Sequence, residues 1–473
     1  MYKYLKYMFE FLLSFVIVQL FLGIVWFTHS FVETPAEGKF FTVLAPLNGA
    51  PGEFVLNYIL WSVIPGIVLA IGILIFIRKI DKKWIYVPLL VVGLSFAFYK
   101  LGIFEYVFVN SMSSNFIKEN YVNPSDVNIE FTNKKNLIYI ILESVENTYA
   151  AKEDGGFMKD SLIPNLTKMA NDNISFSDTN KLGGGLYLDG TSFTTASILA
   201  QMSGVPLKLD IDKINKYDFK KFYEGITLGD ILYENGYENY VIMGSNSEFG
   251  AIDGLYKNHH YNVSDLNTAI AKGKMTQDDI VWWGYSDSDL FKYAKEELLE
   301  ISKNGKPFNY IINTMNTHFK DGYVEKDCEN IFEDQYSNVV YNSDSMVSDF
   351  VDWVKKQDFY ENTVIVIVGD HITMDLKFCN SLPKNYNRTT YNTFINTDFD
   401  KMTIKNNKRL FTQLDMFPTT ISAIGGKIEG DRLGLGTNLF SGKETIIEKY
   451  GYENVQLELN RKSKFLSSLM GKK

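Results

Sequence analysis

Side chains that can bind a metal ion follow two apolar runs in this chain. The run NLIYIILES ends at Glu143, and the run TVIVIVGDH ends at Asp370 and His371. Carboxylates and an imidazole are suitable ligands for a divalent cation, and in layered α/β folds such groups gather at the carboxyl ends of strands. Each residue alone has a simpler explanation, since Glu143 is suited to cap a helix and Asp370–His371 to form a turn. Their joint occurrence favours a metal site.

A run of hydroxyl side chains supplies a candidate nucleophile. The segment GTSFTTASILAQMSGVP follows a glycine-rich loop and has the pattern of a helix that starts near Thr191. The free N–H groups and partial positive charge at a helix N-terminus bind phosphate. A threonine in that first turn, next to a metal, would be activated as a nucleophile. For any single hydroxyl, such as Thr191 or Ser192, the role of N-cap is the simpler explanation.

Short β-branched segments alternate with amphipathic segments across the part of the chain that carries these residues. Strands are predicted at 136–142, 240–243, 308–313 and 363–368, and helices at 161–171, 228–234, 287–301, 344–355 and 413–424. The strands are apolar on both faces, as in a buried parallel sheet. We therefore predict an α/β domain over residues 135–442, with a central, mostly parallel sheet flanked by helices.

Three apolar stretches precede this domain, at about residues 8–27, 54–77 and 84–103. The second has no charged residue over a length that spans a bilayer. The first contains Glu10 and Gln19, and it is too long and lacks the cleavage site of a signal peptide, so we expect it to be retained. Residues 1–110 are therefore predicted to be a transmembrane anchor of three helices.

Basic residues set the expected orientation of the anchor. They flank the first stretch and fill the segment between the second and third, namely Lys3, Lys6, Arg78, Lys79, Lys82 and Lys83. Basic segments stay on the cytoplasmic side. Three crossings that begin in the cytoplasm place everything after residue 110 outside it. The sequence predicts a multi-pass protein of the cell membrane with an extracytoplasmic domain.

The remaining segments, the net charge and the cysteines add further expectations about the structure and the class of protein. Residues 111–134 are polar and predict a linker, and the tail 443–473 is expected to be a frayed, solvated terminus or a membrane-surface helix. The net charge is 47 − 56 = −9 with no basic block, which excludes a typical nucleic-acid binder. Cys328 and Cys379 are predicted to form a disulfide if the domain lies in an oxidising compartment, with two free cysteines as the alternative.

The chain also resembles the phosphoglycerol transferases of the alkaline phosphatase and sulfatase superfamily, which include the lipoteichoic acid synthases. The matching pieces are LIYIILESVENTY, IPNLTKMA, GTSFTTASILAQMSGVPL, WGYSDSDLF, NTMNTHFKDGY, VIVIVGDH and LGLGTNLFSG. They occur in the family's order across most of 135–441. The closest similarity is to the transferases that modify periplasmic glucans. The resemblance implies a sulfatase-like fold for the domain.

The resemblance also implies roles for particular residues. The metal ligands of the family fall on Glu143, Asp370 and His371, and the nucleophile, which also contacts the metal, falls on Thr194. Thr191 and Thr195 remain alternatives for the nucleophile. His318, in the segment NTMNTHF, corresponds to a histidine of the substrate phosphate site.

One region departs from the family pattern. Asn246 lies where lipoteichoic acid synthases bind the lipid headgroup and is a candidate substrate-binding residue. Gly250 and Ile252 stand near the positions at which those enzymes have tryptophan and arginine. The departure favours transfer of a single group over polymerisation.

The resemblance implies a metal-dependent transfer of phosphoglycerol from phosphatidylglycerol to a cell-surface or periplasmic glycan through a threonine intermediate. Manganese is the expected metal, and the same ligands suit magnesium or zinc. Two alternatives stay open. One is a phosphoethanolamine transferase of the same superfamily, and the other is a non-catalytic, membrane-tethered binding protein.

Overall fold

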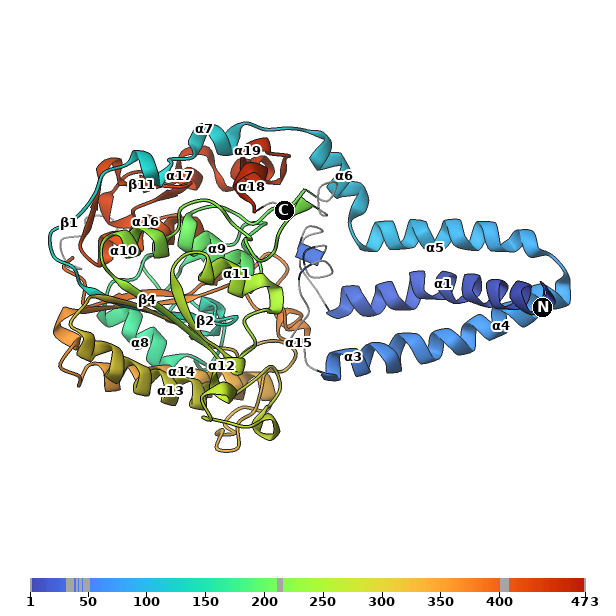
Figure 1. Cartoon of the computed structure of the whole chain (residues 1–473), viewed down its shortest axis with the longest axis horizontal. Helices are drawn as coiled ribbons and strands as arrows, with labels where there is room; N and C mark the ends of the chain where they lie inside the picture. Colours follow the sequence, from blue (N-terminus) through green and yellow to red (C-terminus); the bar gives the residue numbers. More distant parts are fainter. Residues whose placement is uncertain are drawn as a thin grey trace. The chain divides into compact units, whose positions relative to one another are not determined.

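The computed structural model describes residues 2–30, 38–39, 41, 45, 52–210, 216–399 and 408–471. The chain forms two compact units (Figure 1). The small unit comprises Met1–Phe40 and Ala50–Met112, and the large unit comprises Phe41–Gly49 and Ser113–Lys473. The large unit carries the predicted site residues.

The small unit contains three helices that are long and apolar enough to cross a membrane, Tyr4–Ser30, Phe54–Ile80 and Lys83–Lys100. Their elements are α1 (Tyr2–Ser30), α3 (Gly52–Tyr58), a π-helical turn (Ile59–Val63), α4 (Ile64–Ile80) and α5 (Tyr86–Lys100). The third expected stretch extended to residue 103, but α5 ends at Lys100 and α6 (Ile103–Ser111) follows. The predicted spans are otherwise found within these helices.

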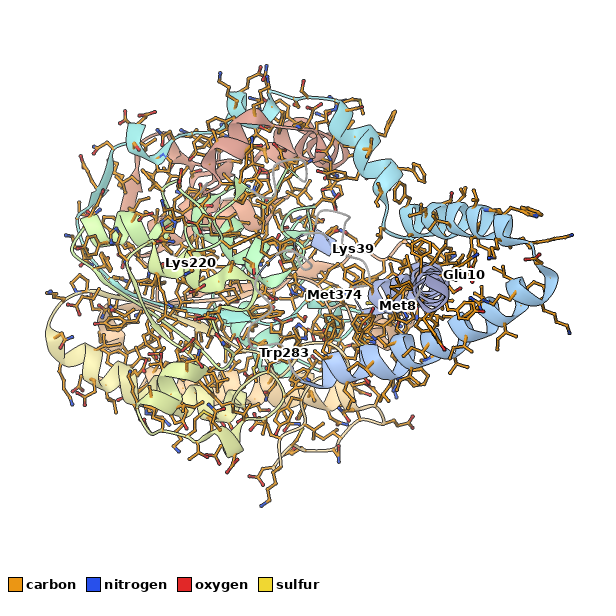
Figure 2. The ribbon with its side chains drawn as sticks, turned by 45° about the vertical axis from the view of Figure 1, so that its right-hand side comes forward. Met8, Glu10, Lys39, Lys220, Trp283 and Met374 are labelled. Atoms are coloured by element: carbon orange, nitrogen blue, oxygen red, sulfur yellow. The ribbon has the colours of Figure 1, made fainter. Side chains whose placement is uncertain are left out.

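The polar residues of the first span are bonded within the small unit. Glu10, labelled in Figure 2, is buried, and its carboxylate lies 2.6 Å from Arg78 Nη2 and 3.1 Å from Lys83 Nζ. Gln19 Oε1 accepts a hydrogen bond from Ser62 Oγ at 2.6 Å. A charge or amide inside an apolar span is tolerated when such partners satisfy it.

A six-stranded sheet in the order β5-β4-β6-β2-β7-β9 forms the centre of the large unit. The strands are β2 (Asn136–Leu142), β4 (Glu238–Met243), β5 (Tyr261–Ser264), β6 (Phe308–Asn313), β7 (Thr363–Gly369) and β9 (Asn392–Ile395). All pairs are parallel except β7 with the edge strand β9. Ile140 of β2 lies opposite Ile312 and Ile367. The predicted α/β fold with a mostly parallel sheet is confirmed.

Helices cover both faces of the sheet (Figure 1). On one face lie α9 (Thr194–Ser203), α10 (Leu228–Glu234), α11 (Ile252–Lys257) and α16 (Met416–Ala423), and on the other α8 (Pro164–Asp172), α12 (Leu266–Ala271), α13 (Asp287–Ile301) and α14 (Gln335–Val354). Alternate residues of β2 enter the two cores, so Tyr139 packs in one and Ile140 in the other. This alternation follows from the period of two in a strand.

Two segments expected to lie outside the domain belong to the large unit. Within the expected linker, α7 (Phe116–Asn120) precedes β1 (Ile129–Phe131), which pairs antiparallel with β10 (Gly426–Ile428). The expectation of a frayed or membrane-surface tail is wrong. The tail forms α17 (Ile446–Tyr450), α18 (Tyr452–Asn460) and α19 (Lys464–Leu469), and it buries the apolar side chains of Ile446, Val455, Leu459, Leu466 and Met470 in the core. Burial of this apolar surface outweighs the polar composition that suggested a solvated end.

The predicted disulfide is also absent from the described residues. Neither Cys328 nor Cys379 forms a disulfide. Cys379 Sγ instead lies 3.3 Å from the carbonyl oxygen of Thr373.

Candidate active site and metal centre

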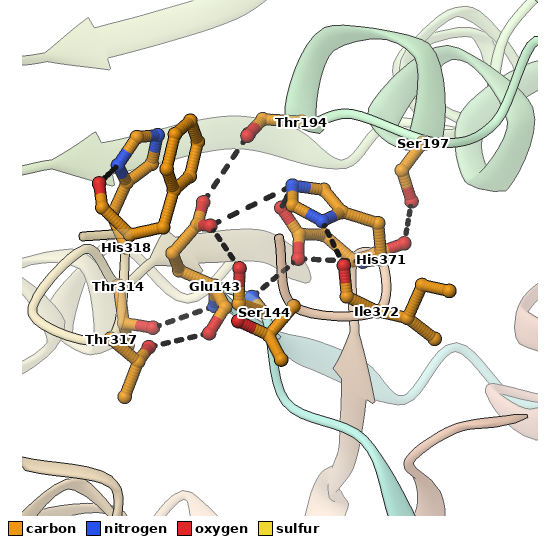
Figure 3. A network of polar contacts seen from close by, with 12 residues as sticks. Glu143, Ser144, Thr194, Ser197, Thr314, Thr317, His318, His371 and Ile372 are labelled. Atoms are coloured by element: carbon orange, nitrogen blue, oxygen red, sulfur yellow. Dashed lines mark hydrogen bonds and ion pairs between the residues drawn. The ribbon is translucent and has the colours of Figure 1, made fainter. Parts of the chain in front are cut away.

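The ends of two neighbouring strands bring the predicted metal ligands together (Figure 3). Leu142 at the end of β2 is paired with Gly369 at the end of β7, so the residues that follow them are adjacent. Glu143, Asp370 and His371 each offer a ligand atom, and these atoms all lie within 4.8 Å of one another. The three side chains are buried. Parallel register alone therefore assembles the cluster from two distant parts of the sequence.

Two polar atoms in this cluster have no hydrogen-bond donor or acceptor among the described residues. They are Asp370 Oδ2 and His371 Nε2, which lie 3.4 Å apart. His371 Nε2 also lies 3.6 Å from Glu143 Oε1. Buried polar atoms without partners are costly, and a cation among them would satisfy all three groups. Two carboxylates and one imidazole fit a divalent metal of the manganese or zinc type.

The protonation equilibria reflect the crowding of charge. Burial and the charge of Glu143 raise the pKa of Asp370, although the imidazole of His371 opposes them. Burial would also raise the pKa of Glu143, but His371, His318 and hydrogen bonds from Ser144 and Thr194 lower it overall. The carboxylate of Glu143 is thus held ionised, while that of Asp370 resists ionisation. A bound cation would remove this conflict.

Backbone and side-chain donors fix the orientation of Asp370. Its Oδ1 accepts hydrogen bonds from the backbone N–H groups of Ser144 (2.7 Å) and His371 (2.6 Å). Its carbonyl oxygen accepts hydrogen bonds from Ser197 Oγ and from Gln413 Nε2. These bonds leave Oδ2 directed toward Glu143 and His371. Sequence reasoning did not identify Ser197 or Gln413, because neither lies near a strand end.

Glu143 is fixed in the same way by the turn after β6. Its backbone N–H donates to Thr314 Oγ1 at 3.0 Å, and its carbonyl oxygen accepts from Thr317 Oγ1 at 2.5 Å. Ser144 Oγ donates to Glu143 Oε1 at 2.6 Å. The segment that precedes His318 is therefore bonded directly to the residue that would bind the metal.

The structure distinguishes the three candidate threonines. Thr194 Oγ1 donates a hydrogen bond to Glu143 Oε2 at 3.2 Å (Figure 3). Thr191 Oγ1 is buried and donates toward Leu188 O and Gln413 Oε1, and Thr195 Oγ1 donates to Gly250 O. Of the three hydroxyls, Thr194 is the one that reaches the ligand cluster.

Helix α9 begins three residues later than expected. Its first residue is Thr194 and its N-cap is Phe193, whereas the pattern of hydroxyls indicated a start near Thr191. Thr191 instead closes a turn, in which its backbone N–H donates to Leu188 O. The N–H group of Thr194 therefore lies in the first turn of the helix. There the N–H groups and the helix dipole favour an anion.

His318 lies beside this cluster (Figure 3). Its Nδ1 lies 2.6 Å from the carbonyl oxygen of Phe319, so Nδ1 is the donor and Nε2 is left as the acceptor. Burial lowers the pKa of His318, although the charge of Glu143 opposes the effect. A neutral imidazole here can accept a proton or a hydrogen bond. Its role at the substrate phosphate site stays a prediction.

Asn246 shows no such placement. Its Oδ1 accepts a hydrogen bond from the backbone N–H of Glu248 at 2.9 Å, which closes a turn after β4. Among the described contacts, none joins its side chain to the ligand cluster. Its role in substrate binding stays a prediction.

A buried ion pair next to the cluster was not predicted. Arg388 Nη2 lies 2.7 Å from Glu146 Oε2, and the carboxylate of Glu146 is fully buried. Arg388 Nη2 also donates to Thr373 O, and the Thr373 N–H donates to Glu146 Oε2. The pair ties the turn after Glu143 to the segment after His371. The two partners are 242 residues apart, so no local sequence signal identifies them.

Comparison with known families agrees with this architecture. The sulfatase family matches residues 135–426, which is more than half of the chain. The chain belongs to the sulfatase family. The match covers the central sheet and both strand ends that carry the ligand cluster.

Individual relatives extend the comparison. The chain is 29% identical over 325 residues to phosphoglycerol transferase I of Citrobacter koseri, covering 65% of this chain and 39% of that protein. It thus spans about two fifths of the length of this curated relative.

Two solved structures share the fold. One is a protein of the alkaline phosphatase superfamily from Vibrio parahaemolyticus, with a TM-score of 0.50, 20% identity and coverage of 72% of this chain and 78% of that one. The other is the lipoteichoic acid synthase LtaP of Listeria monocytogenes, with a TM-score of 0.51, 18% identity and coverage of 70% and 82%.

Proposed function

We propose that this protein transfers a phosphoglycerol group from phosphatidylglycerol to a hydroxyl group of a surface or periplasmic glycan. The name of the Citrobacter koseri relative supports the group transferred. The observation that carries the proposal is the hydrogen bond from Thr194 Oγ1 to Glu143 Oε2, inside a buried cluster with unpaired ligand atoms. A hydroxyl in that position, at the start of α9, is suited to attack a phosphodiester.

In the first step, Thr194 Oγ1 attacks the phosphorus of the donor. A bond between Oγ1 and phosphorus forms as the bond from phosphorus to the diacylglycerol oxygen breaks. Diacylglycerol leaves as the alcohol with the proton that Thr194 loses. The hydrogen bond from Oγ1 to Glu143 Oε2 gives that proton its first acceptor. The first-turn N–H groups of α9 lie where a phosphoryl oxygen would be stabilised.

In the second step, a glycan hydroxyl attacks the same phosphorus. The bond from the glycan oxygen to phosphorus forms, the bond to Thr194 Oγ1 breaks, and the threonine hydroxyl is restored. His318 Nε2 is the acceptor nitrogen of its ring, so it is available to take the proton of the glycan hydroxyl and pass it to Thr194 Oγ1 as the leaving group. A divalent metal held by Glu143, Asp370 and His371, and touching Thr194, would lower the pKa of the nucleophile and neutralise phosphoryl charge. We propose manganese, with magnesium or zinc as competitors.

The anchor suits a lipid donor. Three crossings of the cell membrane that begin in the cytoplasm would hold residues after 110 outside it, next to the lipid headgroups. Tethering raises the effective concentration of the donor at the site. Labelling of single cysteines introduced on either side of the third span, in intact cells, tests this orientation.

Mass spectrometry of the trapped intermediate tests the function. Full-length protein incubated with phosphatidylglycerol, and then digested, should carry a glycerophosphate adduct on Thr194. Thr194→Ala should lose both the adduct and the transfer, and it should keep its metal. The matched controls are Thr191→Ala and Thr195→Ala, whose hydroxyls donate to other groups, and which should keep the adduct.

Each alternative result of this experiment would contradict a different part of the proposed function. An adduct with the mass of phosphoethanolamine, formed from phosphatidylethanolamine, would assign the donor to the alternative transferase class. An adduct on Thr191 or Thr195 would move the nucleophile. Transfer that persists in Thr194→Ala, with no adduct on any of the three threonines, would exclude the covalent mechanism. A protein that binds no metal and turns over neither lipid would be the non-catalytic binding protein.

A further inference from the structure

Two tryptophans occupy the tip of a tight hairpin in the loop before α13. The backbone groups of Val281 and Gly284 exchange both hydrogen bonds, at 2.7 and 2.8 Å, so Trp282 and Trp283 are the two turn residues. Trp283 is labelled in Figure 2. Neither ring belongs to the hydrophobic cores, and both are half-buried. The hairpin therefore presents aromatic rings without using them for core packing.

The hairpin is held firmly on the end of β4. Gly284 pairs with Ser245, and a Cβ added to Gly284 would lie 1.9 Å from Gly244 O. The Tyr285 N–H donates to Gly244 O at 3.1 Å. This close backbone contact fixes the tip relative to the carboxyl edge of the sheet, where the ligand cluster lies.

The conformation of Trp282 makes its identity unexpected. Its φ is +48°, in the left-handed region. The first position of a two-residue hairpin with positive φ usually takes glycine, asparagine or aspartate, since a bulky side chain is strained there. Strain of this kind persists at functional sites because another property of the residue is required.

The rings of the hairpin surround His318. The centroid of the His318 ring lies 4.9 Å from that of Trp283 and 5.9 Å from that of Trp282. Trp282 is also nearly parallel to Tyr323, with ring centroids 6.1 Å apart and an interplanar angle of 20°. The turn before His318 is bonded to Glu143, so this aromatic group is joined through His318 to the residue that accepts the hydrogen bond of Thr194.

The charge around Tyr323 indicates which substrate the rings face. Burial and the negative charges of Glu325 and Asp289 raise the pKa of Tyr323. Glu325 Oε1 accepts hydrogen bonds from Ser288 N and Asn316 Nδ2. Carboxylates whose charge acts on Tyr323 repel an anionic phosphodiester and suit an uncharged, polyhydroxylated molecule. The half-buried rings also argue against insertion into a membrane, which requires exposed apolar surface.

We propose that Trp282, Trp283 and Tyr323 form the acceptor subsite, and that they stack against a neutral pyranose ring of the glycan. This inference rests on the proposed function and names the acceptor as an uncharged sugar. The C–H bonds on one face of a pyranose carry partial positive charge and pack on the negative face of an aromatic ring. The half-buried carboxylate of Glu325, whose charge acts on Tyr323, offers an acceptor to the sugar hydroxyls.

Competition between three acceptors tests the proposal on the full-length protein in phosphatidylglycerol micelles. The acceptors are cellotetraose, glycerol and water, and the last gives the rate of donor hydrolysis. In Trp282→Ala and Trp283→Ala, the KM for cellotetraose should rise about tenfold or more, and this loss should clearly exceed any change in glycerol transfer and in hydrolysis. Trp282→Tyr should retain most of the cellotetraose activity. The control is Tyr233→Ala, an exposed aromatic residue at the end of α10 that stacks on His260.

The outcomes separate the two proposals. If the wild-type protein neither hydrolyses nor transfers from the lipid, the proposed function fails. If it does turn over the lipid but prefers glycerol to cellotetraose, the sugar subsite is overturned. Equal loss for all three acceptors in the tryptophan variants would show a purely structural role. A raised KM for phosphatidylglycerol alone would assign the rings to the donor.

Discussion

Asp370 and Asp415 are both fully buried carboxylates of the large unit, yet their oxygens have different partners. Asp415 Oδ1 accepts from Thr437 N at 2.8 Å and its Oδ2 from Thr412 N at 2.9 Å, so both oxygens are satisfied. Asp370 Oδ1 accepts two hydrogen bonds, and its Oδ2 accepts none from the described residues. Burial raises the pKa of both carboxyls to about 7. The pKa therefore does not distinguish them, but the unpaired oxygen does.

The difference separates a carboxylate that stabilises the fold from one that awaits a ligand. Both carboxylate oxygens of Asp415 have partners within the protein. Asp370 Oδ2 would gain a partner from a cation shared with Glu143 and His371. Removing the charge of Asp370 should therefore lower activity but not stability. Removing the charge of Asp415 should lower stability but not activity.

The largest expected effect is on catalysis by Asp370→Asn. Loss of the charge should remove the metal and lower transfer on the order of 10³-fold or more. The unfolding temperature of the metal-free protein should stay the same or rise, because repulsion with Glu143 is relieved. Elemental analysis and calorimetry with chelator measure both. The assignment is wrong if Asp370→Asn purifies with full metal and normal turnover.

A second comparison uses two arginine–glutamate pairs of the large unit, Arg388 with Glu146 and Arg409 with Glu448. Glu146→Gln weakens the pair with Arg388 that holds the segment after His371, and it should lower metal affinity about 10- to 100-fold. Glu448→Gln weakens the pair with Arg409, whose Nη2 lies 2.8 Å from Glu448 Oε2. Metal titration followed by calorimetry should show that Glu448→Gln lowers stability without changing affinity. Equal affinity loss in both variants would refute a specific role for Glu146.

A third prediction concerns stability alone. Asp415→Asn replaces one acceptor oxygen with an amide that faces a backbone N–H, so it should lower the free energy of unfolding by about 1–3 kcal/mol. Metal affinity and the KM of the donor should not change. Urea denaturation monitored by circular dichroism gives the loss. A neutral effect would mean that the hydrogen bonds to Thr412 and Thr437 contribute little.

The smallest expected effect is a pH dependence of the metal-free protein. Burial raises the pKa of Asp287 and Asp415 to about 7 and that of Asp344 to about 6. Between their ordinary pKa near 4 and these raised values, the folded state binds more protons than the unfolded state. Stability should therefore fall as pH rises from about 4 to 7.

The variant Asp344→Asn sharpens this test. Asp344 accepts hydrogen bonds from the N–H groups of Asn165 and Leu166 at the start of α8. The variant should lose stability and show a shallower fall between pH 4 and 6 than the wild type. Denaturation at three pH values in chelator measures the slope. A slope as steep as that of the wild type would mean that Asp344 does not titrate in this window.

Local pattern by itself determined the strands and the residues at their ends. The strands 136–142 and 308–313 were predicted to the residue, because β-branched runs bounded by polar residues encode a buried strand directly. A residue that follows a parallel strand must lie at its carboxyl edge, so Glu143, Asp370 and His371 could be grouped before any coordinates. The resemblance then singled out Thr194.

Only the tertiary structure decided which groups are adjacent across the chain. The choice of Thr194 over Thr191 and Thr195 depends on the start of α9 and on a hydrogen bond to a residue 51 positions away. The burial of the tail, the pairing of Glu146 with Arg388 and the grouping of Trp282 with Tyr323 likewise depend on long-range packing. Local periodicity reports which face of an element is apolar, but it does not report which distant surface will cover that face.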